Sequence, residues 1–446
     1  MLNGSLWDKI LLFALPLALT GILQQLFNAA DVAVVGRFVS ADAMAAVGSN
    51  APLISLLVNF FVGISLGTNV VIANAIGSND RKTVEKAVHT SVLVALVGGV
   101  FMAVTGELIA EPMLHLLGVP PEVFPMSLLY LRFYMAGMPI ILLYNFESAI
   151  YRSAGNTKTP LMVLAVSGVI NFLLNLFFVI GLKRTTDGVA MATVISNFIS
   201  AAILFVGLMK TESAVRVDIR KMRIDKRVLS RILCIGVPSG VQSMTFSAAN
   251  LVVQSAINSL GNIIMAGSSA ALNIEVFAYY MLNSFGQACT TFVGQNNGAG
   301  KPERCRKALK LCLLEGFILT FSEIGVILLY GKNLLWIFNK DPAVIASGYT
   351  RLMFMFGAYF FSLISEVMSG YMRGYGMSAF PALMSLVGIC GTRMVWISTV
   401  FRRYPSFENI MTVYPISLGI TAAAVCICVL MLRPDKIAEK KIKITE

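Results

Sequence analysis

Three polar residues interrupt the first long apolar run of the chain at helical spacing. Gln24, Asn28 and Asp31 follow one another at intervals of four and three residues, so a helix would place them on one face. A carboxylate inside a bilayer is costly, and such a face must point into a helix bundle or a wet cavity. Asp31 is therefore a candidate for binding a proton or a cation.

Two later apolar runs carry polar pairs at the same spacing. Asn171 and Asn175 lie one helical turn apart. Thr193 and Asn197 repeat that interval in the next run. We expect these side chains to line one polar pocket with Asp31, where a lone, partly desolvated carboxylate can exchange a proton near neutral pH. A structural cluster that only ties helices together is the alternative.

The second half of the chain offers two further acids, Glu275 and Glu366, as candidates for binding the coupling ion. Glu366 either binds a cation or pairs with Arg393 of the next apolar run. In the first half, Glu147 precedes Arg152 by five residues, and we expect those two to form an ion pair.

Composition shows which kind of element must hold these residues. Of 446 residues, 57% are hydrophobic and 13% are charged, and the mean hydropathy is +0.77. An ordinary soluble domain carries roughly 25% charged residues. The first apolar run, 10–35, is far longer than the roughly 7–15 residue core of a signal peptide, so it predicts a membrane span.

Windows of about 20 apolar residues, long enough to cross a bilayer, fit twelve times along the chain. We therefore expect an all-α integral membrane protein with twelve transmembrane helices. The predicted spans are 10–35, 47–77, 87–110, 125–151, 160–182, 188–209, 231–259, 266–295, 308–331, 344–372, 379–401 and 410–432.

Most of the 35 lysines and arginines fall in connections on one side of these spans. Because cytoplasmic loops carry the excess of Lys and Arg, both termini are expected in the cytoplasm of a cell whose plasma (inner) membrane holds the protein. Basic loops that face an anionic leaflet also account for the net charge of +12, and no nucleic-acid partner is needed.

Three separate stretches recur at nearly one offset. "YRSAGNTKTP", ending at Pro160, matches "MRGYGMSAFP", ending at Pro381, at a shift of 221 residues. "VGSNA" matches "AGSSA" at a shift of 219, and Asn28 falls on Asn250 at a shift of 222. Such a repeat is typical of transporters that are built from duplicated halves.

The repeat predicts two pseudo-symmetric lobes of six helices each. We place the first lobe at 1–209, a cytoplasmic linker at 210–230, the second lobe at 231–432 and a cytoplasmic basic tail at 433–446. Six crossings return the chain to its starting side, so an axis along the membrane normal should relate the lobes. A cavity between such lobes would be the substrate path.

Catalytic and ATP-binding motifs are missing from the chain. "GQNNGAGKPE" looks like a phosphate loop, but Gln295 stands where the first glycine would be needed, and Pro302 follows Lys301. Two histidines give no zinc site and no histidine-based triad, and the seven cysteines are expected to be free thiols. We expect no enzyme activity and no cofactor, so uphill transport would have to use an ion gradient.

Several motifs together resemble the multidrug and toxic compound extrusion family. The segment "IEVFAYYMLNSFGQACTTFVGQNNGAGKPERCRKA", 274–308, looks like the eighth span of that family and the loop after it. Asn28-x-x-Asp31 followed by V-G-R is similar to its first span, and "RSAGNTKTP" to its loop after span four. The resemblance implies secondary active export of amphipathic, often cationic, compounds by alternating access, driven by inward protons or sodium.

The resemblance also implies roles for particular residues. In one group of members, the aspartate of span one acts with polar residues of spans one, five and six; the matching positions here are Gln24, Asn28, Asp31, Asn171 and Thr193. The chain departs from that group at Asn175, where those members have a second aspartate. A weaker or single-acid coupling is therefore implied.

Other members share a cation site in the second lobe, with acids in spans seven and ten. Residues 232–259 contain no acid, so that site is incomplete and leaves Glu275 and Glu366 as its candidates. We therefore expect protons, rather than sodium, as the coupling ion.

Three functions stay open from the sequence. The first is an ion-coupled exporter of small amphipathic or cationic molecules that works as a monomer in the lipid bilayer. The second is a lipid-linked glycan flippase, which would favour a cavity lined by several arginines, whereas the spans contain only Arg132, Arg351 and Arg393. The third is a passive channel, although no ring of charges or repeated carbonyls is encoded.

Overall fold

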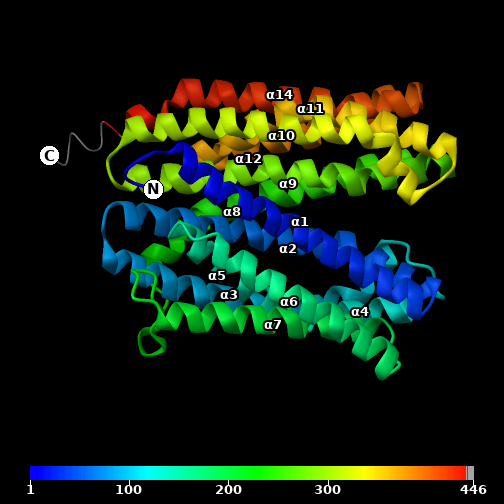
Figure 1. Ribbon diagram of the computed structural model, residues 1–446, viewed down its shortest axis with the longest axis horizontal. Coiled ribbons are helices and arrows are strands. Elements are labelled where there is room, and N and C mark those ends of the chain that lie inside the picture. Colours follow the sequence, from blue (N-terminus) through cyan, green and yellow to red (C-terminus); the bar gives the residue numbers. More distant parts are fainter. Residues whose placement is uncertain (438, 440–446) are drawn as a thin grey trace. The chain divides into compact units, whose positions relative to one another are not determined.

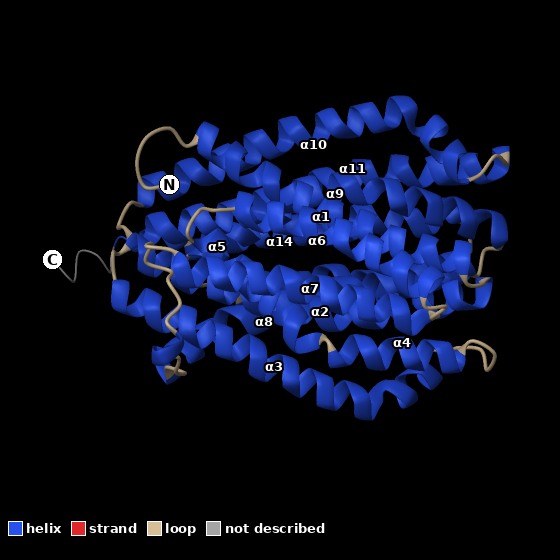
Figure 2. Cartoon of the chain, turned by 60° about the horizontal axis from the view of Figure 1, so that its bottom comes forward, coloured by secondary structure: helices blue, strands red, loops and turns tan. Residues whose placement is uncertain are grey.

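The computed structural model describes residues 1–437 and 439, and much of the predicted basic tail lies outside them. Long helices lie side by side through most of the chain (Figure 1). Within the described range all regular structure is helical and no strand occurs (Figure 2). The prediction of an all-α membrane protein is confirmed.

The first part of the chain forms seven α-helices and a π-helical turn, η1. They are α1 (Trp7–Phe38), α2 (Ala41–Gly77), α3 (Arg81–Leu116), α4 (Phe124–Ala136), α5 (Met138–Ser153), α6 (Lys158–Leu176), η1 (Phe177–Gly181) and α7 (Thr186–Lys210).

The second part begins with a short 3-10 turn, η2, and is interrupted by two more π-helical turns. Its elements are η2 (Ile219–Lys221), α8 (Lys226–Asn258), α9 (Asn262–Gly298), α10 (Pro302–Phe338), α11 (Pro342–Gly374), α12 (Ala379–Ser385), η3 (Leu386–Gly391), α13 (Thr392–Trp396), η4 (Ile397–Phe401) and α14 (Phe407–Leu432).

Eleven of the described helical segments are long and apolar enough to cross a membrane, and α4 with α5 provide a twelfth if the bent pair counts as one span. The pair bends by 50° at Gly137. Pro139 follows at once, and because proline lacks an N–H and its ring crowds the preceding turn, it weakens the helix where the pair bends. The predicted span 125–151 is therefore a broken helix.

The chain separates into two compact units by its internal packing. Unit 1 contains Met1–Ala18, Gly77–Asn79 and Cys234–Glu446, and unit 2 contains Leu19–Ile76 and Asp80–Leu233. The start of α1 thus packs with the second half of the chain. The lobe boundaries that the sequence suggests remain predictions.

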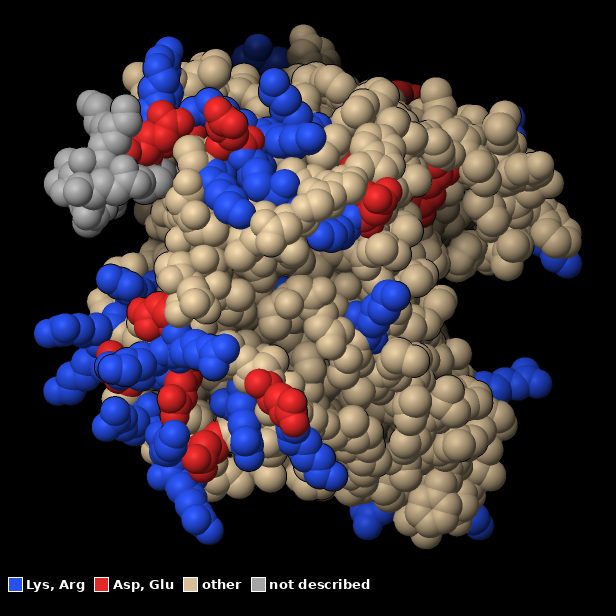
Figure 3. Space-filling view, turned by 60° about the vertical axis from the view of Figure 1, so that its left-hand side comes forward, with Lys and Arg blue, Asp and Glu red and all other residues tan. Residues whose placement is uncertain are grey.

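In unit 2, the charged linker lies beside the first turns of α3. The backbone N–H groups of Asp218 and Asp225 donate to His89 Nε2 at 3.0 Å and Thr90 Oγ1 at 3.1 Å. The Lys86 ammonium, 2.9 Å from the Asp225 carboxylate, holds the pKa of that carboxyl below its ordinary value. Figure 3 shows lysine and arginine side chains gathered towards one side of the face in view.

In unit 1, α9 packs against both α10 and α11, and α11 also packs against α14. The loop that looks like a phosphate loop lies beside the start of the chain. Lys301 Nζ donates to the carbonyl of Leu2 at 3.1 Å, and the Arg304 guanidinium donates to the carbonyls of Met1 and Gly4. These basic residues therefore hold the N-terminal segment instead of a phosphate.

Candidate functional site

Helices α1, α6 and α7 bring together the polar residues that the sequence groups into one pocket. Asn175 Nδ2 donates to Asp31 Oδ1 at 2.5 Å, and Thr193 Oγ1 donates to Asp31 Oδ2 at 3.2 Å. Asn171 completes the group, because its Oδ1 accepts from Asn175 at 3.2 Å and its Nδ2 lies 3.5 Å from Thr193 Oγ1. Asp31 is only 6% exposed.

Local packing explains how α1 comes so close to α6. Phe27 lies against Gly168, and a Cβ at residue 168 would fall 1.8 Å from the Phe27 Cζ atom. Glycine therefore allows an approach that no larger residue permits without a shift of the ring. Phe27 precedes Asp31 by one helical turn. The contact with Gly168 therefore fixes the position along α6 at which Asp31 meets Asn175.

A further polar contact joins α6 and α7 one helical turn away from the pocket. Ser167 lies one turn from Asn171, and its hydroxyl accepts a hydrogen bond of 2.6 Å from Ser200. Both serines are buried. Side chains at helical spacing on two facing helices thus form a polar seam through an otherwise apolar lobe.

Gln24 and Asn28 do not join this network. Neither side chain makes a hydrogen bond to another described residue, and Asn28 is exposed whereas Gln24 is half-buried. Their expected part in coupling remains a prediction. Asn197 does not join the network either, because its amide donates to the Thr193 carbonyl of its own helix.

The partners of Asp31 in the described chain are neutral. An amide and a hydroxyl donate to its two oxygens, and no lysine or arginine forms an ion pair with it. Asp187, also buried in unit 2, pairs with Arg184 at 3.0 Å instead. Asp31 can therefore gain or lose a proton without breaking an ion pair, which is the chemistry of a proton carrier.

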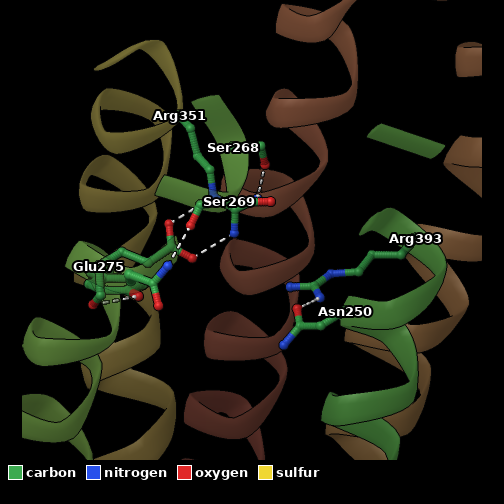
Figure 4. Close-up of polar contacts among 8 residues, drawn as sticks. Asn250, Ser268, Ser269, Glu275, Arg351 and Arg393 are labelled. Atoms are coloured by element: carbon green, nitrogen blue, oxygen red, sulfur yellow. Dashed lines mark hydrogen bonds and ion pairs between the residues drawn. The ribbon is translucent and has the colours of Figure 1, made fainter. Parts of the chain in front are cut away.

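Each of the two candidate acids of the second half, Glu275 and Glu366, is held by an arginine. Arg351 forks onto Glu275, with Nε and Nη2 at 3.0 and 2.6 Å from the two carboxylate oxygens, and its Nη1 donates to Ser268 at 2.8 Å (Figure 4). Arg373 lies 3.3 Å from Glu366 in the same helix. A pair with Arg393, one of the two roles that the sequence left open for Glu366, does not form, because two turns of α11 already bring Arg373 to the face of Glu366.

Glu147 also differs from its expected arrangement. Its side chain is fully buried in α5, and neither oxygen has a hydrogen-bond partner among the described residues. The predicted ion pair with Arg152 does not form in the structure. Five residues along a helix turn the two side chains about 140° apart, which opposes a direct contact.

Arg393 is the residue whose importance the sequence reasoning missed. It reaches from α13 to Asn250 of α8, with Nη1 at 2.6 Å from Oδ1 (Figure 4). Its Nε donates to Ser417 of α14 at 3.2 Å. The signal was present in the repeat, because Asn250 corresponds there to Asn28, next to the pocket of the first half.

Comparison with known protein families gives one match that covers most of the chain. The family model described as MatE matches residues 16–177 and 238–397. The two segments correspond to the two repeated halves, and each begins at the proline near the start of α1 or inside α8.

Two curated relatives resemble the chain over nearly its full length. The probable multidrug resistance protein YoeA of Bacillus subtilis is 28% identical over 426 residues, which are 94% of this chain and 92% of that protein. The probable multidrug resistance protein NorM of Thermotoga maritima is 27% identical over 397 residues, which are 86% of this chain and 84% of that protein.

Solved structures share the fold. An outward-facing multidrug resistance MATE family transporter of the MOP superfamily gives a TM-score of 0.90 at 19% identity, with 98% of both chains covered. A MATE crystal structure in a bent conformation gives 0.88 at 20% identity, with 100% of this chain and 98% of that chain covered.

Proposed function

Because the chain belongs to the MatE family, the multidrug and toxic compound extrusion transporters, we propose that it is a secondary active multidrug exporter. Its substrates are small amphipathic or cationic molecules, and inward ion flow drives their export by alternating access. Relatives that carry the name of multidrug resistance proteins support this function. The same comparisons do not favour a lipid-linked glycan flippase.

Coupling takes place at Asp31 in this proposal. The observation that carries it is a buried carboxylate whose partners, Asn175 and Thr193, are both neutral. Glu275 and Glu366 are less suited to this task, since each would have to leave an arginine before it could take up an ion. Asp31 takes up a proton when the pocket faces outside and releases it towards the cytoplasm.

Protons are the coupling ion in this proposal, rather than sodium. The Asn175 amide and the Thr193 hydroxyl each turn a hydrogen towards an oxygen of Asp31. A sodium ion bound to Asp31 Oδ1 would require an oxygen atom where the Asn175 amide nitrogen now lies. The pocket is therefore better suited to a proton than to a metal cation.

The cellular setting follows from the same function. The chain works as a monomer in the plasma membrane, with both termini in the cytoplasm, and binds small molecules rather than nucleic acid. It catalyses no covalent reaction and carries no cofactor. The basic linker next to α3 is consistent with a cytoplasmic surface that faces anionic lipid.

The test is ethidium efflux from proteoliposomes under an imposed proton gradient and then under a sodium gradient. Wild type is compared with Asp31→Asn, which keeps the shape of the side chain but cannot carry a proton. We expect proton-driven efflux that falls by about tenfold or more in the variant, the scale of losing one proton-transfer group. Asp42→Asn, the same change at an exposed site, is the matched control.

Each alternative gives a different result. Sodium-driven efflux that survives Asp31→Asn would place the coupling site outside this pocket. A variant that loses thermal stability but keeps its proton coupling would make Asp31 a structural residue. The absence of efflux of any amphipathic cation under either gradient would contradict the transport function itself.

A further inference from the structure

An apolar groove lies between α10 and α11 in unit 1. Its volume is about 390 Å³, and its lining includes Lys310, Leu314 and Phe317 of α10 and Phe360 and Ile364 of α11. Every lining side chain except Lys310 is apolar. Cavities of roughly 300–1,000 Å³ hold small organic molecules in proteins, so the groove is large enough for part of one.

The groove opens at the surface of the protein. Leu314, Phe317 and Phe360 are exposed, whereas Leu363 at its floor is buried. Only 33% of the most apolar stretch of α10 is buried within the protein. Since α10 is long and apolar enough to cross a membrane, we expect the exposed lining to meet hydrocarbon. A component of the bilayer can therefore enter the groove from the side.

Lys310 marks one end of the apolar part of α10. Five lysines and arginines fall within 301–310, and the next basic residue after Lys310 is Lys332. A change from basic to apolar sequence indicates where a helix enters the membrane, because basic side chains gather beside anionic headgroups. Lys310 is thus expected at the depth of the headgroups, and the groove leads from there towards the centre of the bilayer.

The charge of Lys310 has no counter-charge in the described chain. Lys301 and Arg304 hold the N-terminal segment, and Arg306 pairs with two acids that follow α14. Lys310 itself forms no hydrogen bond or ion pair with another described residue. The next acid of its own helix, Glu315, is buried, and neither of its oxygens has a described partner. Lys310 is therefore available to an anion from outside the chain.

Three phenyl rings lie at the other end of the groove. The rings of Phe317 and Phe360 have centroids 6.2 Å apart and planes at 87°, and Phe321 lies 4.6 and 6.4 Å from them. Phe317 follows Lys310 by seven residues, which is about 10 Å along a helix. The groove thus runs from a positive charge to a cluster of aromatic edges and faces.

This length suits one acyl chain of a lipid. Half of the hydrocarbon core of a bilayer is roughly 15 Å thick, so a groove of about 10 Å that starts at headgroup depth stays within one leaflet. Because hydrocarbon already surrounds the groove, a chain that lies in it gains packing contacts rather than a hydrophobic driving force. The charge of Lys310 would supply the selectivity between headgroups.

We propose that this groove binds one anionic phospholipid. Lys310 holds the headgroup phosphate, and one acyl chain lies along Leu314 and Ile364 as far as the rings of Phe317 and Phe360. The orientation proposed above puts this lipid in the cytoplasmic leaflet, which is the leaflet that carries anionic lipid. The site does not include Asp31 or its partners, and it does not depend on the export function.

The test measures lipid binding to the purified full chain in detergent by native mass spectrometry. Dioleoyl phosphatidylglycerol and dioleoyl phosphatidylcholine have the same acyl chains, but only the first has a net negative charge. We expect the first bound phosphatidylglycerol to bind about fivefold more tightly, the scale of one lysine near an anionic headgroup. Lys310→Gln should remove this preference. Lys158→Gln, an exposed lysine at the start of α6, should keep it.

A second pair of variants tests the acyl chain. Leu314→Trp fills the groove with a larger side chain, whereas Leu329→Trp adds the same ring at an 81% exposed position of the same helix. We expect Leu314→Trp to weaken the binding of both lipids by about threefold or more through lost packing contacts. Leu329→Trp should bind both lipids as wild type does.

Three results would overturn the proposal. The first is a preference for phosphatidylglycerol that survives Lys310→Gln, and the second is equal lipid binding by the two tryptophan variants. The third is displacement of the lipid by an equal concentration of inorganic phosphate, which would mean that the acyl chain contributes nothing. The measurement needs no ion gradient, so a failed efflux experiment would leave the lipid site intact, and a failed lipid site would leave the exporter intact.

Discussion

At the scale of single residues, Glu147 leads to a stability prediction. Its carboxyl is fully buried and has no hydrogen-bond partner among the described residues. An ionised carboxylate there would lose its hydration, and no hydrogen bond or ion pair would compensate for that loss. We expect Glu147→Gln to be as stable as wild type, and Glu147→Leu to be more stable by about 1–3 kcal/mol because an unsatisfied polar group is removed. Thermal unfolding in detergent measures both. A large loss of stability in both variants would contradict this account.

The residues themselves show what spacing can and cannot predict. Asn175 and Thr193 could be grouped with Asp31 because a polar face in a membrane span has to be buried, and helical spacing identifies that face. Spacing does not reveal which helix lies opposite. The arginine that was considered as a partner of Glu366 was therefore Arg393 of the next span, as the alternative to a bound cation, whereas Arg373 lies two turns along the same helix.

At the scale of elements, α9 and α11 approach closely at two glycines. A Cβ on Gly370 would lie 2.3 Å from the carbonyl oxygen of Gly286, whereas Gly357 in the same helix has nothing within 4 Å of its Cβ position. We expect Gly370→Ala to separate the helices and lower stability by about 1–3 kcal/mol. Gly357→Ala should raise stability by about 0.5–1 kcal/mol through helix propensity. Chemical denaturation in detergent, followed by circular dichroism, measures the stability of both variants. Equal changes in the stability of the two variants would contradict the packing argument.

The elements were largely predictable, apart from their irregular turns. Apolar length alone located the membrane helices, because a bilayer needs about 20 apolar residues to be crossed. The break at Gly137 was missed, although Pro139 beside it is a recognisable signal. The π-helical turns η1, η3 and η4 have no comparable sequence signal, since one extra residue in a turn leaves the hydrophobic pattern nearly unchanged.

At the scale of the whole molecule, the charge pattern and the number of crossings depend on one another. The basic stretch at the start of α3 can lie on the same side of a membrane as the basic stretches after α5 and in the linker 211–225 only if α4 and α5 together cross it once. If the bent pair instead entered and left on the same side, every later loop would change sides. The charge rule therefore favours twelve crossings over eleven.

This argument predicts where the two ends of the chain are found. Twelve crossings put both termini in the cytoplasm, whereas eleven would put them on opposite sides. We expect a green fluorescent protein fused after Glu446 to fluoresce, and alkaline phosphatase fused there to be inactive. An epitope inserted between Lys340 and Asp341, in the loop from α10 to α11, should lie outside the cytoplasm. An antibody should therefore bind it in cells whose plasma membrane is intact, once any outer layer has been made permeable. Active phosphatase at the C-terminus together with a cytoplasmic N-terminus would show that α4 and α5 form a re-entrant pair, and the expected six-plus-six arrangement would then be wrong.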